Sequence, residues 1–264
     1  MRKNPVKEKL RRGEASFGTW LSLGDLYATR VLARMGFDWL TLDIEHSAID
    51  WSRATTIFGA VADAGCVPLA RVPEGSHHYI KRVLDAGAFG IVVPMVDTVE
   101  QAQIAIAAAY YPPTGNRSVG GAVHALNFDT DAPTYFAKAN DEILIVLQCE
   151  HIQAVRDFDQ VFSVPGIDAV FVGPNDLAAS MRSADGKPPA PDLFKETLAS
   201  ILAGCKRNKV AAGIHTFSVE EAKMRMAEGW QFIAINSELR MMMDGAKRVL
   251  DGLGIQKPGD MVKY

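Results

Sequence analysis

The stretches EILIVLQCE (residues 142–150) and AVFVGPND (residues 169–176) are apolar, strand-like runs that each end in an acidic residue, Glu150 in the first and Asp176 in the second. In a parallel α/β barrel the C-terminal ends of all the strands open onto one face, and this face carries the chemistry. Two carboxylates at neighbouring strand ends therefore predict a divalent-metal site on that face.

Short β-rich runs alternate with helical patterns along the chain, which is typical of βα units around a parallel sheet. Strands are expected at residues 17–23, 39–45, 67–72, 90–96, 142–148, 168–173, 210–215 and 232–236, and the last helix at 238–253, before a polar tail. Eight such units in 264 residues predict one α/β domain over residues 1–264, a (β/α)8 TIM barrel. A doubly wound open sheet is the alternative, but no Gly-rich dinucleotide or phosphate-binding motif follows any strand.

Residues 111–141 interrupt the alternation, with three prolines and three glycines and no strand-like run. A long irregular segment inside a compact domain is usually functional or disordered. The motif YPPTGNR (111–117) is therefore expected to be an ordered loop that covers a site. A tolerated insertion is the alternative interpretation.

The composition excludes several classes of protein. Apolar residues make up 48% of the chain, and 28 Lys and Arg against 31 Asp and Glu give a formal charge of −3, so we expect neither nucleic acid nor a membrane as partner. Three cysteines without a spacing motif indicate reduced thiols. The charged N-terminus lacks the apolar run of a secretory signal, and a cytoplasmic protein is expected.

Two earlier strand ends carry further charged residues. The segment LTLDIEHS (40–47) places Asp43 and Glu45 on one side of a strand and begins the following loop with His46, which is either a general base or a structural hydrogen-bonding group. Arg71 lies inside the apolar run VPLARV, where a charge requires a partner. It either pairs with a core carboxylate or holds a substrate carboxylate or enolate oxygen.

Glu150 and Asp176 favour a hard cation, because both candidate ligands are carboxylates and neither is a Cys or a His. Mg²⁺ suits one or two carboxylates completed by water and substrate, and Mn²⁺ or Co²⁺ suits the same site. Ion pairing of the two acids is the alternative. Gly173 and Pro174 predict a tight turn before a helix that begins at Asp176, whose free N–H groups form an anion site.

Three further residues lie at or just after the ends of expected strands. His151 follows Glu150 but begins a helix, and its role stays open. His215 and Thr216 end the seventh strand and are expected to line the pocket, with no role assigned to His215.

The chain resembles the HpcH/HpaI aldolase/citrate lyase family, and specifically its pyruvate-dependent class II 2-keto-3-deoxy acid aldolases, over about residues 15–250. The matching segments include FDWLTLDIEH, PLARVP, YPPTGNRS, VLQCE and PGIDAVFVGPNDLAAS. The resemblance implies a barrel of the phosphoenolpyruvate/pyruvate type, with the last helix swapped between subunits and a hexamer that is a trimer of dimers.

The resemblance also implies roles around the metal. Glu150 and Asp176 would bind the divalent ion. The N–H groups at Asn175 and Asp176, which follow Gly173 and Pro174, would hold the carboxylate of pyruvate. Gln148 would also contact the pyruvate.

Further implied roles concern the charged strand ends. Arg71 would stabilise the enolate oxygen. His46, oriented by Asp43, would act as acid and base. Glu45 would lie next to these residues without contacting the substrate. Asp85 matches a family aspartate that reaches the site of a neighbouring subunit.

Two departures from the family pattern concern the aldehyde half of the substrate. Glu150 is followed by His151 where the family usually has Thr or Ser. The seventh strand ends IHTF (214–217), where the family tends to have an apolar residue that contacts the aldehyde. The aldehyde is therefore not assigned.

Together with these residues, the resemblance implies a metal-dependent aldolase that cleaves a 4-hydroxy-2-oxo acid reversibly into pyruvate and an aldehyde. A lysine Schiff base is disfavoured, because no Lys lies inside an expected strand. Oxaloacetate decarboxylation and C–C cleavage of a CoA thioester use the same enolate, although no Lys/Arg cluster for CoA lies near the strand ends. A non-catalytic barrel that binds a metabolite is the third interpretation.

Overall fold

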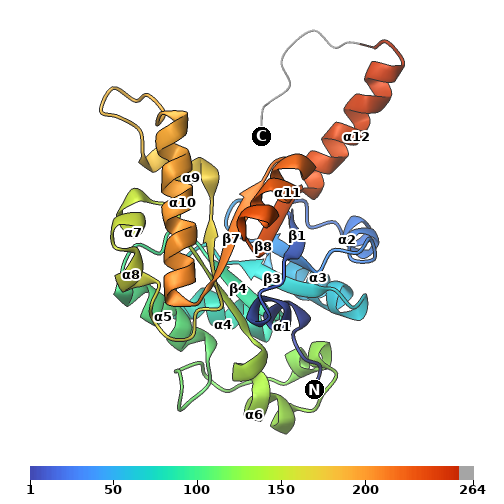
Figure 1. Cartoon of the computed structure of the whole chain (residues 1–264). Helices are drawn as coiled ribbons and strands as arrows, with labels where there is room; N and C mark the ends of the chain where they lie inside the picture. Colours follow the sequence, from blue (N-terminus) through green and yellow to red (C-terminus); the bar gives the residue numbers. More distant parts are fainter. Residues whose placement is uncertain (256–264) are drawn as a thin grey trace.

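Eight parallel strands form a closed barrel in which each strand pairs with the next and β8 returns to β1 (Figure 1). The computed structural model describes residues 1–255, so the predicted polar tail lies largely outside the described residues. The strands are β1 (Ser16–Leu21), β2 (Trp39–Asp43), β3 (Val67–Arg71), β4 (Gly90–Val93), β5 (Leu144–Gln148), β6 (Ala169–Val172), β7 (Ala211–Thr216) and β8 (Phe232–Ser237). The predicted (β/α)8 barrel and all eight strand positions are confirmed.

Helices surround the barrel and return the chain from the end of one strand to the start of the next. They are α2 (Leu26–Leu32), α3 (Trp51–Asp63), α4 (His77–Asp85), α5 (Val99–Ala109), α7 (Ile152–Arg156), α8 (Phe158–Val161), α9 (Pro174–Ser180), α10 (Pro191–Asn208), α11 (Val219–Glu228) and α12 (Glu238–Gly252). Helix α9 begins at Pro174 and not at Asp176 as predicted, because proline fixes a helical φ and needs no N–H partner in the first turn.

The segment between α5 and β5 lies at the amino ends of the strands, away from α9 and α12 (Figure 1). It contains a 3-10 helix, η1 (Val123–Phe128), and helix α6 (Ala132–Glu142). The prediction that residues 111–117 cover a site is wrong within one chain, because none of them lines the pocket described below. The physical reason is topological: a connection from a helix to the next strand runs to the amino end of the barrel.

An additional helix, α1 (Pro5–Arg11), packs beneath the barrel, where the sequence indicated only a charged terminus. Asn4 caps this helix by accepting the N–H groups of Val6 and Lys7. The Lys7 ammonium is buried, donates to the Ile143 carbonyl at 2.6 Å, and lies 3.0 Å from Asp168. A buried, paired lysine fixes the helix against the start of β5 and β6.

Aromatic packing fills the interior between β1, β2 and β8. Trp39 stacks on Phe232 with ring centroids 4.2 Å apart. A Cβ at Gly18 would lie 2.1 Å from the Trp39 ring, so only glycine allows this approach.

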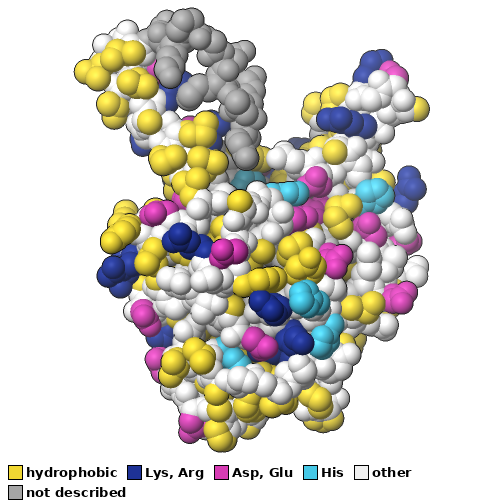
Figure 2. All heavy atoms as spheres, turned by 180° about the vertical axis from the view of Figure 1, so that it is seen from behind, with side chains coloured by type: hydrophobic (Ala, Val, Ile, Leu, Met, Phe, Trp, Pro, Cys, Tyr) yellow, Lys and Arg dark blue, Asp and Glu magenta, His cyan; other side chains and the backbone are white. Residues whose placement is uncertain are grey.

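Helix α12 projects from the face of the barrel formed by the carboxyl ends of the strands (Figure 1). Glu238, its first residue, is its only buried side chain. Apolar side chains are exposed along the rest of it, and yellow side chains appear on the projection at the upper left of Figure 2. The exposed apolar residues of α12 include Met242, Val249 and Leu250. Over residues 1–255, no helix combines the length and the apolar character needed to cross a membrane.

Candidate active site

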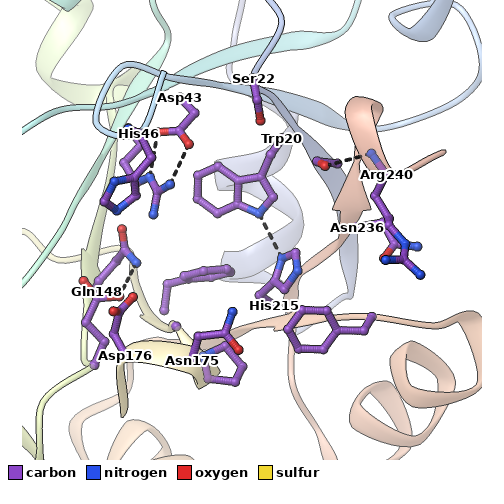
Figure 3. A pocket seen from close by; sticks show the side chains of 17 residues that line it. Trp20, Ser22, Asp43, His46, Gln148, Asn175, Asp176, His215, Asn236 and Arg240 are labelled. Atoms are coloured by element: carbon purple, nitrogen blue, oxygen red, sulfur yellow. Dashed lines mark hydrogen bonds and ion pairs between the residues drawn. The ribbon is translucent and has the colours of Figure 1, made fainter. Parts of the chain in front are cut away.

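A pocket of about 430 Å³ opens at the carboxyl ends of the strands (Figure 3). Every strand except β4 contributes a lining side chain, either from its last residues or from the loop that follows. The pocket contains both acids predicted at strand ends, Glu150 and Asp176, together with Arg71 and His46. Because the ends of these seven strands converge here, residues far apart in the sequence become neighbours.

Arg71 is held by two carboxylates, one from the end of the neighbouring strand β2 and one from the loop that follows it. Asp43 and Arg71 are register partners in β2 and β3, and the guanidinium donates to Asp43 at 3.0 Å from Nε and 2.6 Å from Nη2. Glu45 lies 3.2 Å from Arg71 Nε. Burial opposes the charge on the guanidinium, but the hydrogen bond to Asp43 and the neighbouring carboxylates raise the pKa of Arg71. Arg71 is therefore a permanent cation at the pocket wall.

Glu150 is a buried carboxylate that accepts two hydrogen bonds, one from a backbone N–H group and one from a side-chain amide. Glu150 is 3% exposed. Its carboxylate accepts a hydrogen bond from the Met95 N–H at 2.9 Å and another from Nε2 of Gln148 at 2.7 Å. Met95 adopts a φ of 51°, a left-handed conformation that is costly for a non-glycine residue and aims its N–H at Glu150. Burial, aided by the charge of Asp176, raises the pKa of Glu150 to about 7.

Gly173 allows this arrangement by letting the Glu150 carboxylate lie against the backbone of β6. A Cβ at position 173 would lie 2.3 Å from Oε2 of Glu150. The register that pairs Gln148 with Phe171 places the ends of β5 and β6 side by side. Glycine is thus required for contact between a side chain and a backbone, and not for a turn.

Glu150 and Asp176 fit a hard divalent cation. Neither carboxylate forms an ion pair with another described residue, so the alternative of ion pairing within residues 1–255 is not realised. Oε1 of Gln148 is buried beside them without a hydrogen-bond partner in this part of the chain. No group of three or more His, Cys, Asp or Glu residues with metal-ligand geometry occurs among the described residues. Two carboxylates suit Mg²⁺, which keeps several water or substrate ligands.

His46 lies at the rim of the pocket, where its side chain is 65% exposed. Oδ1 of Asp43 accepts the backbone N–H of His46 at 3.2 Å, and Asp43 makes no hydrogen bond to the ring. The ring instead lies 3.6 Å from Glu45, measured from Nε2 to Oε2. Glu45, and not Asp43 as expected, is the carboxylate beside the imidazole. The reason is that Asp43 is already engaged by Arg71.

Asp85 lies at the end of α4, and within one chain it is not brought into the pocket. Its Oδ1 accepts a hydrogen bond from Nη2 of Arg117 at 2.7 Å, and the Arg117 side chain is fully buried. Arg117 also donates to the Tyr135 hydroxyl and lies 4.5 Å from the centre of the Tyr111 ring. Asp85 therefore neutralises a buried cation at the amino end of the barrel.

Two residues adjoining the predicted site have local roles. His151 caps α7, because its Nδ1 accepts the Gln153 N–H at 3.3 Å. Thr216 was expected in the pocket but is buried, and its hydroxyl donates to the Ala234 carbonyl. Both positions follow from side-chain hydrogen bonds to nearby backbone groups, which sequence position alone does not reveal.

The pocket also contains residues that the sequence did not single out. Trp20 from β1 donates its indole N–H to Nδ1 of His215 at 3.0 Å, and the ring of Trp20 lies 4.7 Å from the Arg71 guanidinium (Figure 3). Asn236 and Arg240 come from the end of β8 and the start of α12. They line the part of the pocket away from Gln148 and Asp176. The end of β1 carries no titratable group, so only its position at a strand end could have indicated Trp20.

Comparison with known proteins gives a consistent assignment. A model of the HpcH/HpaI aldolase/citrate lyase family matches residues 16–244. The 2-keto-3-deoxy-L-rhamnonate aldolase of Escherichia coli (strain K12) is 35% identical over 262 residues, which cover 98% of this chain and 97% of that protein.

Solved structures agree with this match. An HpcH/HpaI aldolase/citrate lyase family protein from Burkholderia cenocepacia J2315 is 32% identical, with a TM-score of 0.87 over 95% of this chain and 99% of that one. The HpcH/HpaI aldolase from Desulfitobacterium hafniense DCB-2 is 26% identical, with a TM-score of 0.85 over 97% and 98%. The resemblance predicted from the sequence is confirmed. The chain therefore belongs to the HpcH/HpaI aldolase/citrate lyase family, and it is a carbon–carbon lyase of the aldolase type.

Proposed function

We propose that this aldolase cleaves a 4-hydroxy-2-oxo acid reversibly into pyruvate and an aldehyde, with a divalent metal ion held by Glu150 and Asp176. The observation that carries the proposal is a buried carboxylate, Glu150, which shares one pocket with Asp176 and with the permanent cation Arg71. The curated relative in Escherichia coli is named for a 2-keto-3-deoxy acid of this kind, which supports the substrate class.

The metal ion would supply a Lewis acid that polarises the 2-oxo group and stabilises negative charge on its oxygen. Mg²⁺ or Mn²⁺ fits the oxygen ligands, and Co²⁺ is a further candidate. Gln148 fixes one oxygen of Glu150 through its Nε2 and keeps its own Oε1 in the pocket wall.

The protein's own groups would place the 2-oxo acid. The N–H groups of Asn175 and Asp176 lie in the first turn of α9, where backbone donors are free to hold a carboxylate. Gly173 and Pro174 line the pocket beside them and leave room for close approach. Arg71 would stabilise the oxygen that becomes the enolate, because its charge is preorganised by Asp43 and Glu45.

His46 would exchange the proton. In cleavage it takes the proton of the C4 hydroxyl while the bond between C3 and C4 breaks. The bonding electron pair becomes the pyruvate enolate, and the C4 fragment leaves as an aldehyde. Carbon 3 of the enolate then takes a proton and gives pyruvate. Glu45, 3.6 Å from the imidazole, would stabilise the ring when it is protonated.

Exchange of the pyruvate methyl protons in D₂O, followed by NMR, tests the enolate step without any assumption about the aldehyde. We expect exchange with Mg²⁺ or Mn²⁺ and its loss when EDTA removes the metal, because only the bound cation stabilises the enolate enough. Readdition of Mn²⁺ is the control for irreversible damage. Exchange at the full rate in EDTA would contradict the metal-dependent proposal.

Gly173→Ala is expected to weaken metal binding strongly and so to raise the Mn²⁺ concentration that the enzyme requires. Its methyl group would force the Glu150 carboxylate away from β6. Displacement of a ligand through its support typically costs about 10- to 100-fold in metal affinity or activity. The measurement is the Mn²⁺ concentration that gives half-maximal exchange. Gly120→Ala is the matched control, because a Cβ at Gly120 meets no atom within 4 Å. Equal Mn²⁺ requirements in both variants would refute the predicted role of Gly173.

We also propose that copies of the chain assemble by exchange of α12, within a hexamer that is a trimer of dimers. The exposed apolar side chains of α12 require cover that one chain does not provide. Tyr27 and Val31 of α2 are likewise exposed and suit such a helix. Asp85, partly exposed at the amino end, is proposed to serve the site of a neighbouring copy.

Leu250→Glu is expected to dissociate the oligomer and so to reduce the molecular mass of the particle in solution. Leu250 is 40% exposed on α12, and a buried carboxylate there would oppose helix exchange. The measurement is light scattering coupled to size exclusion. Leu193→Glu on α10, at 50% exposure in the monomer, is the matched control that should keep the parent mass. An unchanged mass for Leu250→Glu would exclude α12 from the interface.

A further inference from the structure

His215 is held in one uncharged form by Trp20. The indole N–H is a donor only, so the nitrogen that receives it, Nδ1 of His215 at 3.0 Å, must be an acceptor. An imidazolium would turn a second N–H toward the indole. His215 is therefore neutral and carries its proton on Nε2. Burial, with the charge of Arg71 nearby, lowers the pKa of His215 to about 4, which agrees with this geometry.

The protonated nitrogen of His215 is available to a ligand. The ring lines the pocket, and Nε2 has no hydrogen-bond partner among residues 1–255. A neutral N–H donor with a fixed tautomer inside a pocket is an orienting group for a polar ligand atom.

Asn236 provides a second polar group from the next strand. It has a φ of 51°, and the register between β1 and β8 shifts beside it. Asparagine adopts this left-handed conformation more readily than most non-glycine residues. Its side-chain amide lines the pocket and makes no hydrogen bond to another residue of the described chain. Figure 3 shows His215 and Asn236 on the side of the pocket away from Gln148 and Asp176.

The remaining surroundings favour a neutral ligand group with one apolar side. Trp20 and Phe217 form the walls next to His215, and the Phe217 ring lies 4.7 Å from the imidazole. Arg240 also lines this part, but its guanidinium is paired with Asp244 at 3.0 Å. The pairing of Arg240 with Asp244 weakens the attraction of its guanidinium for an anionic group.

We propose that Nε2–H of His215 and the amide of Asn236 bind a hydroxyl group on the aldehyde half of the substrate, so that the enzyme selects short hydroxyaldehydes over hydrocarbon and anionic aldehydes. The assignment rests on the proposed function, which puts pyruvate beside Glu150 and Asp176. The aldehyde half then extends toward β7 and β8, where these two groups lie.

The test compares lactaldehyde with propionaldehyde, which lacks only the hydroxyl group, as acceptors for pyruvate with the full chain and Mn²⁺. The ratio of their kcat/KM values is the readout, because a general loss of activity cancels in it. We expect the parent to prefer lactaldehyde by about tenfold or more, and His215→Leu to bring the ratio close to one. His215→Gln is the matched variant, because its amide accepts from Trp20 and still donates, and it should keep the preference.

Asn236→Gly provides an independent variant that removes the amide at a backbone conformation that glycine adopts freely, and the preference should fall here too. An unchanged ratio in both His215→Leu and Asn236→Gly would overturn the assignment. A parent enzyme that prefers succinic semialdehyde to lactaldehyde would overturn the substrate class. Absence of pyruvate exchange in the parent would instead overturn the proposed function, and the assignment with it.

Discussion

Glu150→Gln is expected to reduce pyruvate methyl exchange by about 1,000-fold or more. The variant keeps the size of the side chain but removes the buried charge that would hold the metal ion. A metal ion contributes several kcal/mol to stabilising charge in a transition state, and each 1.36 kcal/mol corresponds to a factor of ten. The measurement is the exchange rate in D₂O at saturating Mn²⁺.

The free energy of unfolding of the metal-free variant shows whether the loss of exchange comes from lost metal binding or from misfolding. The pKa of Glu150, raised to about 7 by burial, means that the metal-free folded protein binds a proton more tightly than the unfolded chain. Its stability therefore falls as pH rises from about 4.3 to about 7, and glutamine removes this fall. Metal-free Glu150→Gln should be more stable than the parent at pH 8, by up to about 3 kcal/mol in urea unfolding.

Glu142→Gln is the matched control, because Glu142 accepts the Asn4 N–H at the amino end of the barrel, away from the pocket. Its exchange rate should equal that of the parent. A Glu150→Gln variant that exchanges normally would show that Glu150 does not hold the metal. A variant that is inactive and also unfolded would assign Glu150 a structural role.

Arg71→Leu is expected to have two large effects. It leaves Asp43 and Glu45 partly buried without their cation, and breaking a buried ion pair in this way costs about 3–5 kcal/mol of unfolding free energy. It also removes the charge that faces the enolate oxygen, which should lower exchange by about 100- to 1,000-fold. Urea unfolding and the D₂O exchange rate measure the two effects separately.

A double variant distinguishes the two roles of Arg71. Adding Asp43→Asn to Arg71→Leu removes a buried charge that has lost its partner, so part of the stability should return while exchange stays low. Arg71→Lys keeps one positive charge without the two-pronged contact to Asp43 and should be intermediate in both measurements. Recovery of exchange together with stability would show that Arg71 acts only on the fold.

The barrel could be predicted from the sequence because its strands are apolar runs bounded by helical patterns. The register between neighbouring strands then follows from closure of the barrel. The same logic placed Glu150 and Asp176 in one pocket, since both follow strand ends. Pairings between side chains were harder to predict from the sequence. Asp43 was expected to orient the ring of His46, but the direct register match with Arg71 takes both of its oxygens.

Segments that return the chain to the amino end of the barrel were the least predictable. Residues 111–117 were assigned to the site because their composition suggested function, yet loops at opposite ends of a barrel have similar compositions. The ion pair of Asp85 with Arg117 spans two such segments, and no periodicity indicates it. Helix α1 was missed because its charged residues mask a short amphipathic pattern, although Asn4 and Pro5 form a recognisable helix start.

Trp20 joins the two halves of the pocket, because one ring contacts the Arg71 guanidinium through its face and His215 through its N–H. Redesign of acceptor preference through Trp20 would therefore disturb enolate formation at the same time. Asn236 makes no hydrogen bond to Arg71 or His215 within the described chain, so a substitution there can change the acceptor specificity while the pyruvate chemistry is preserved. The route by which related enzymes acquire new acceptors should accordingly run through the end of β8 before it reaches β1.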